Sequence, residues 1–184
     1  MVLSTGARSV LIAPFDEKHM QSEIFGKSIL IFGCGNVLLG DDGFGPAVAA
    51  HLQQNYSLPP QVLVMDVGTS IRDVLFDLAL NDTKPGKLII IDAVDYPDRR
   101  PGEIFEIPVE GIPPKKTTDF SLHQFPTVNI LKELKDHTGI EIKIMAAQIE
   151  SIPAEVRPGL SRPVQQAVAR ASRQIMENLH LNQD

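Results

Sequence analysis

Several residue types and patterns are scarce in this chain, and each scarcity excludes a class of function. The 184 residues include no Trp, two Tyr and one Cys. The chain therefore lacks the aromatic side chains on which single-stranded nucleic acid stacks. One cysteine forms neither an internal disulfide nor a Cys-x-x-Cys metal site, which fits a reducing cytoplasm. No apolar run approaches the roughly 20 residues that a membrane-spanning helix needs, so we expect no membrane partner.

The net charge, composition and length of the chain further restrict its possible partners and its number of domains. The formal net charge of -6 argues against nucleic acid and anionic membrane surfaces as partners. A content of 43% hydrophobic and 22% charged residues is typical of a globular protein with a full core. The length fits one domain, since domains cluster at about 100–200 residues. We predict an N-terminal extension over residues 1–26 and a single domain over residues 27–184.

Strand and helix patterns alternate along the chain. Such alternation predicts an α/β fold of three layers, α/β/α, with a twisted, mostly parallel sheet of about five strands. The expected strands cover residues 28–32, 61–65, 87–91, 103–107 and 141–147, and the expected helices cover residues 45–54, 69–80, 128–135 and 163–179. A long loop is expected over residues 108–127.

The first expected strand runs into a glycine-rich turn with the sequence G-C-G-N-V-L-L-G-D-D-G-F-G-P at residues 33–46. A dinucleotide-binding turn needs glycine at its first, third and sixth positions, and the sixth position here is Leu38. The turn then reaches Asp41 and Asp42, which would repel a pyrophosphate and suit a metal cation.

Further acidic side chains are expected at the same edge of the sheet. In an open α/β sheet, ligands bind beyond the carboxyl ends of the strands. Asp66 and Asp92 are expected to end the second and third strands, and His123 lies in the long loop. Two carboxylates and an imidazole suit a first-row transition metal with open coordination positions.

Each of these residues also has a structural interpretation. Asp41 and Asp42 are equally suited to capping the helix that follows them. Asp66 lies where a dinucleotide-binding protein places its ribose-binding acid, and His123 alone is more often a surface or packed histidine. Cys34 is most simply a small residue on a tight turn, and less simply a reactive thiol.

The motifs together resemble the hydrogenase maturation endopeptidases, which trim the C-terminus of the large subunit of nickel-iron hydrogenases. The resemblance covers residues 28 to 180 and includes one departure, Val67, where the family often has glycine. Details at residues 95–98 and 101–102 resemble the archaeal branch that serves deazaflavin-reducing hydrogenases. The matching segments are the turn at residues 33–46, M-D-V-G-T at 65–69, I-I-D-A-V at 90–94, S-L-H-Q at 121–124, A-Q-I-E at 147–150 and L-S-R-P-V at 160–164.

The resemblance implies a nickel-binding trio of Asp42, Asp92 and His123, which would also be the catalytic residues. The nickel would be supplied by the substrate rather than bound permanently. Asp41 would support the turn. The remaining positions that would support the turn or the substrate are Gly35, Asn36, Gly68, Thr69 and Gln148.

The resemblance also implies an activity: removal of the C-terminal extension of a nickel-loaded large-subunit precursor by a cytoplasmic monomer. The substrate is expected in the crevice above the sheet, flanked by residues 108–127 and 66–71. Two alternatives stay open at this point. One is a nickel-dependent checkpoint or chaperone that binds the precursor without cutting it. The other is a nucleotide-binding module.

Overall fold

The computed structural model describes residues 24, 26–111 and 125–180, and its centre is a five-stranded sheet. Neighbouring strands pair in parallel, except for β4, which pairs antiparallel with β5 at one edge. The strand order is β2-β1-β3-β5-β4, with β1 at Ile29–Cys34, β2 at Val62–Gly68, β3 at Lys87–Val94, β4 at Ile104–Ile107 and β5 at Glu141–Gln148.

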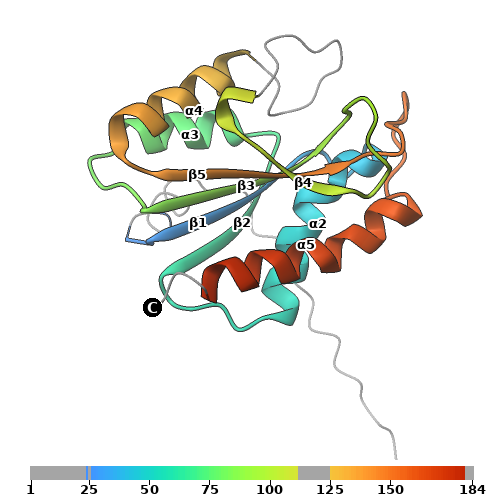
Figure 1. Ribbon diagram of the computed structural model, residues 1–184, viewed down its shortest axis with the longest axis horizontal. Coiled ribbons are helices and arrows are strands. Elements are labelled where there is room, and N and C mark those ends of the chain that lie inside the picture. Colours follow the sequence, from blue (N-terminus) through green and yellow to red (C-terminus); the bar gives the residue numbers. More distant parts are fainter. Residues whose placement is uncertain (1–23, 25, 112–124, 181–184) are drawn as a thin grey trace, which may run out of the picture.

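Helices cover both faces of this sheet (Figure 1). One face carries α3 and α4, and the other carries α2 and α5. This arrangement confirms the predicted three-layer α/β fold. The helices span Phe44–Asn55 (α2), Ile71–Leu80 (α3), Phe125–Thr138 (α4) and Arg162–His180 (α5), and short 3-10 turns span Gly40–Gly43 (η1) and Val109–Gly111 (η2).

The alternation of side chains along the central strands divides the core between the two faces. Leu30 and Phe32 of β1 pack toward α3 and α4, whereas Ile31 packs toward α2 and α5. Every residue of β3 is buried, because helices cover both sides of this strand. Ile24, inside the stretch expected to be an extension, is also buried in the core cluster on the α3 and α4 face.

Two strand ends lie farther along the chain than the sequence predicted. Asp66 and Asp92 were expected to follow their strands, but β2 continues to Gly68 and β3 continues to Val94. The reason for β3 is its partner strand, because parallel pairing with β5 continues to Val94 and Gln148. The expected loop is also shorter, since η2 and the start of α4 occupy its two ends.

The strand order places a ligand-binding crevice at the centre of the sheet. The chain moves outward from β1 to β2 and then crosses to β3 on the other side of β1, so the order reverses between β1 and β3. In open α/β sheets this switch point opens a crevice at the carboxyl ends of the strands. η1 follows β1 and contacts β3 at this point.

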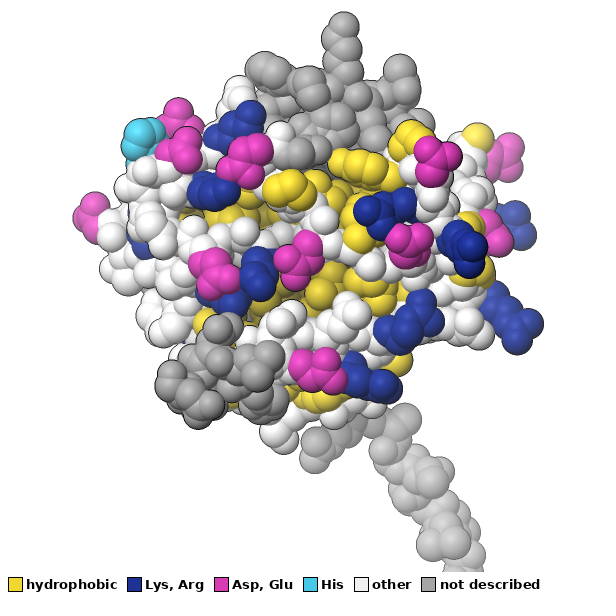
Figure 2. All heavy atoms as spheres, in the orientation of Figure 1, with side chains coloured by type: hydrophobic (Ala, Val, Ile, Leu, Met, Phe, Trp, Pro, Cys, Tyr) yellow, Lys and Arg dark blue, Asp and Glu magenta, His cyan; other side chains and the backbone are white. Residues whose placement is uncertain are grey.

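The surface of the described part of the chain has two further features. The face in Figure 2 carries acidic and basic side chains intermixed, with hydrophobic side chains visible between them. In the same described part, no helix is both long and apolar enough to cross a membrane.

Candidate active site

Glycines set the position of the turn that follows β1. A Cβ atom on Gly45 would lie 2.3 Å from the carbonyl oxygen of Cys34 and 2.4 Å from that of Ile91. A Cβ atom on Gly33 would lie 2.3 Å from the carbonyl oxygen of Gly45. The start of α2 therefore packs directly against β1 and β3. In a dinucleotide-binding turn, the third glycine allows the helix to pack closely on the strand. Here Leu38 occupies that position, and Gly45, later in the chain, allows the close packing instead.

Asp42 is buried in η1 at the switch point. Its Oδ2 accepts a hydrogen bond from the backbone N–H of Asn36 at 2.8 Å. Its Oδ1 is a buried oxygen that accepts no hydrogen bond from any described residue. Burial raises the pKa of this carboxyl above its ordinary value of 3.8, and the hydrogen bond from Asn36 partly opposes that shift. The turn thus holds a buried carboxylate oxygen that is available to bind a cation.

Gly35 allows the turn to close tightly around Asp42. Its φ of 127° is in the region that favours glycine, and a Cβ atom here would lie 1.8 Å from the carbonyl oxygen of Asp42. Gly35 also donates its N–H to the carbonyl oxygen of Gly68 at 3.0 Å. Asn36 accepts the N–H of Leu38 on its side-chain oxygen at 3.0 Å. The turns after β1 and β2 are therefore fixed to each other beside Asp42.

Asp92 lies inside β3 and is fully buried. Its Oδ1 accepts the backbone N–H of Ala93 at 2.9 Å. Strand alternation directs its side chain toward α3 and α4, the same side as Ile90 and Val94. A carboxylate this deep in a sheet needs polar partners or a cation, because burying an unpaired charge is costly.

Cys34 is the last residue of β1 and is fully buried. Burial raises the pKa of its thiol well above the ordinary value, and the charges of Asp92, Asp66 and Asp42 raise it further. The thiol is therefore shielded from solvent, and its burial favours the interpretation of Cys34 as a small residue on a tight turn. The carboxyl groups of Asp42, Asp66 and Asp92 thus all lie near enough to the end of β1 to act on this thiol.

Asp41 fixes η1 to two distant segments. Its carboxylate accepts the backbone N–H of Glu150 at 2.8 Å, the backbone N–H of Ser161 at 2.6 Å and the Ser161 hydroxyl at 2.9 Å. The capping alternative is wrong for both acids. The cap residue of α2 is Gly43, which has no side chain, and no side-chain hydrogen bond is made at this cap.

Replacement of Asp41 should cost stability. We expect Asp41→Ala to lower the free energy of unfolding by about 3 kcal/mol, because two partly buried backbone N–H groups and a hydroxyl lose a charged acceptor. Urea denaturation at pH 7 measures the difference. Ser161→Ala is the matched control, with an expected loss of about 1 kcal/mol for one hydroxyl bond. Equal stability of Asp41→Ala and wild type would show that the three bonds contribute nothing.

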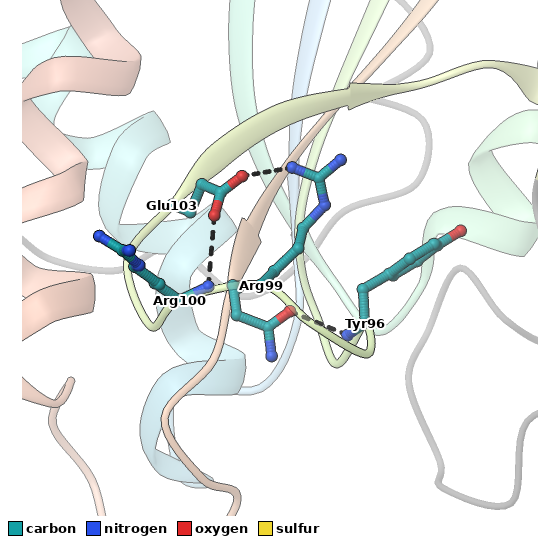
Figure 3. A network of polar contacts seen from close by, with 5 residues as sticks. Tyr96, Arg99, Arg100 and Glu103 are labelled. Atoms are coloured by element: carbon teal, nitrogen blue, oxygen red, sulfur yellow. Dashed lines mark hydrogen bonds and ion pairs between the residues drawn. The ribbon is translucent and has the colours of Figure 1, made fainter.

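Gln148, at the end of β5, holds the loop between β3 and β4. Its Oε1 accepts the backbone N–H of Tyr96 at 2.8 Å, and its Nε2 donates to Asp95 at 2.9 Å. Within this loop, Glu103 binds the Arg99 guanidinium and the Arg100 backbone N–H (Figure 3). Gln148 therefore supports this loop, at some remove from the turn after β1. The sequence contained no signal for this network beyond the motif around Gln148.

The remaining predicted positions divide between the described and undescribed parts of the chain. Thr69 is exposed directly after β2, next to Gly68. His123 lies outside the described residues, so its place relative to Asp42 and Asp92 stays a prediction. Within the described ranges, no three His, Cys, Asp or Glu side chains are grouped to hold a metal ion.

Comparison with known proteins identifies the family of this chain. The model of the hydrogenase maturation protease family matches residues 46–178. A Methanocaldococcus jannaschii protein assigned to the hydrogenase maturation proteases is 41% identical over 146 residues, which are 79% of this chain and 92% of that protein. The delta subunit of the coenzyme F420 hydrogenase of Methanothermobacter thermautotrophicus is 32% identical over 155 residues, which are 82% and 94% of the two chains.

A solved structure agrees with the sequence comparisons. The hydrogenase maturating endopeptidase HybD from E. coli superposes with a TM-score of 0.68 and 26% identity, over 84% of this chain and 93% of that one. The family predicted from the motifs is confirmed: the chain belongs to the hydrogenase maturation proteases.

Proposed function

We propose that this protein is an endopeptidase that removes the C-terminal extension of a nickel-iron hydrogenase large-subunit precursor after nickel insertion. In this proposal Asp42, Asp92 and His123 recognise the nickel that the precursor carries. The observation that carries the proposal is the buried Oδ1 of Asp42, which lacks a hydrogen-bond donor at the switch point of the sheet. The protein acts as a cytoplasmic monomer that docks on its larger substrate.

The chemistry of the donor set supports this assignment. Two carboxylates and a neutral imidazole bind first-row divalent metals, and three ligands leave coordination positions open for the substrate. Asp42 is buried, and its raised pKa reflects the cost of its charge without a cation. A divalent ion on the precursor would offset that cost. Productive docking would then depend on whether the precursor has received its nickel.

The matched relatives suggest the type of substrate. One of them is a subunit of a coenzyme F420 hydrogenase, and coenzyme F420 is a deazaflavin. We propose the large-subunit precursor of a deazaflavin-reducing hydrogenase as the substrate to test first.

The experiment is intact-mass analysis of that precursor, with and without nickel and with and without this protein. We expect loss of a C-terminal peptide only when both are present, because the nickel carried by the precursor would supply the Lewis acidity that hydrolysis of the scissile peptide bond needs. An unchanged mass with a stable, nickel-dependent complex would favour the checkpoint alternative. An unchanged mass with no complex would contradict both functions for this precursor.

A further inference from the structure

We propose that a groove between the turn after β1 and the start of α2 binds the C-terminal extension of the precursor as an extended peptide. An aliphatic side chain of the peptide would occupy the apolar end of this groove. The inference rests on the proposed function and adds the place where the substrate tail lies. We call this groove the tail groove.

The apolar end of the tail groove is a hollow of about 330 Å³. Its lining is largely small or aliphatic, and Asp66 is its acidic member. This volume suits a branched aliphatic side chain of an incoming peptide. The lining contains three glycines, and at one of them, Gly159, an added Cβ would meet no atom within 4 Å, so a peptide backbone can approach closely there. The aliphatic and alanine side chains of this lining are Val37, Ala47, Ala50 and Leu160.

The other end of the tail groove reaches the candidate active site. A second hollow of about 230 Å³ shares Val37, Pro46 and Asp66 with the first and continues to Gly35 and Asn36. Both of these residues contact Asp42, because the Asn36 N–H binds its carboxylate and Gly35 lies against its carbonyl oxygen. A peptide lying along the two hollows would therefore pass over the turn residues that hold Asp42, whose own side chain is buried.

The rim of the tail groove is apolar and held in place by backbone bonds. Val37, which lines both hollows, is 53% exposed, and its neighbour Leu38 is 47% exposed. The Arg157 N–H donates to the carbonyl oxygen of Leu38 at 2.8 Å, and the Gly40 N–H donates to that of Arg157 at 3.0 Å. Exposed apolar side chains on a fixed rim are typical of a surface that a partner covers.

The shape and charge of the tail groove favour a peptide over a second copy of this chain. Two adjoining hollows that share three lining residues suit neighbouring side chains of an extended segment. A stable protein interface needs about 1,000 Å² or more of buried surface, well beyond a narrow groove. Asp66 in the groove and the net charge of -6 also disfavour association with an identical acidic chain.

Photo-crosslinking from Val37→Cys tests this placement. The native Cys34 is fully buried, so a benzophenone maleimide should label only the introduced cysteine. After irradiation with the nickel-loaded precursor, we expect the crosslink within the C-terminal extension. Phe76→Cys on α3 is the matched control, because Phe76 is 54% exposed and lies on the opposite helical layer. A crosslink in the body of the large subunit or in a second copy of this chain would overturn the inference.

A second variant keeps the test decisive if the label itself blocks docking. We expect Val37→Asp to lower kcat/KM for the nickel-loaded precursor at least about tenfold, which corresponds to about 1.4 kcal/mol. Phe76→Asp should cleave like wild type. If wild type releases a peptide and Val37→Asp is equally fast, the tail groove is wrong and the proposed function stands. If wild type releases no peptide, the proposed function fails, and the inference fails with it.

Discussion

Asp42→Asn should reduce release of the C-terminal peptide from the nickel-loaded precursor by about 100-fold or more, because an amide is a poor ligand for a divalent metal. The substitution keeps the size of the side chain, and its amide oxygen can still accept the Asn36 N–H that Asp42 accepts at 2.8 Å. Initial rates from intact-mass time courses measure the effect. Cleavage at the wild-type rate would remove Asp42 from the site.

The same variant provides its own control for folding, because its stability has a predicted pH dependence. Burial raises the pKa of Asp42 in the folded state above its ordinary value of 3.8. The folded protein therefore holds the Asp42 proton more tightly than the unfolded chain. This stabilisation is fully present below the unfolded pKa and is lost as the pH rises through the folded pKa.

It follows that at pH 7 the charged Asp42 carboxylate is a cost to stability that Asp42→Asn removes. We expect the stability of the variant relative to wild type to be more favourable at pH 7 than at pH 3. Urea denaturation of both proteins at the two pH values measures the difference. An inactive variant that is at least as stable as wild type at pH 7 would place the loss in the chemistry. A variant much less stable at pH 7 would contradict the pKa argument.

The fold could be predicted from the sequence because both of its signals are local. Continuous apolar runs such as the one before Gly33 mark buried parallel strands, and the helical spacing of Ile71, Val74, Leu75 and Leu78 marks α3. The predicted positions of the strand ends were less accurate than the predicted strands themselves. Asp92 looks like a strand terminator in sequence, yet pairing between β3 and β5 carries the strand past it. That pairing joins residues more than fifty positions apart, and local pattern does not encode it.

The sequence predicted which residues form the candidate site better than it predicted the contacts that those residues make. The motif at residues 33–46 contains both acids but does not distinguish their roles. The distinction depends on Glu150 and Ser161, which lie more than a hundred residues later and supply the donors to Asp41. Among the described residues, Asp42 receives its hydrogen bond from within its own turn, at Asn36. The difference between a structural and a chemical acid is therefore a tertiary property.

Gly45 is a position where we expect a large loss of stability from the addition of a single methyl group. The Cβ of Gly45→Ala would lie 2.3 to 2.5 Å from the carbonyl oxygens of Cys34 and Ile91 and the backbone nitrogen of Cys34. All three are backbone atoms of the central strands β1 and β3, which have little freedom to move. We expect the free energy of unfolding to fall by about 3 kcal/mol or more, as measured by urea denaturation.

Gly86→Ala is the matched control for this prediction. The nearest atom to its added Cβ is the carbonyl oxygen of Ser28 at 3.7 Å, an ordinary contact, and its φ lies outside the glycine-favouring region. We expect a change within about 1 kcal/mol of wild type. Similar stabilities for the two variants would contradict the close packing of α2 on the sheet.

The Gly45 prediction extends from stability to activity, because η1 directly precedes α2. Relief of the clash requires the start of α2 to move away from the sheet, and Asp42 moves with it. Cleavage measured at low temperature, where the Gly45→Ala protein is still folded, should therefore be slower than that of wild type. Full activity of the folded variant would show that close packing of α2 sets stability alone. Loss of activity would show that this packing also places the Asp42 carboxylate at the switch point.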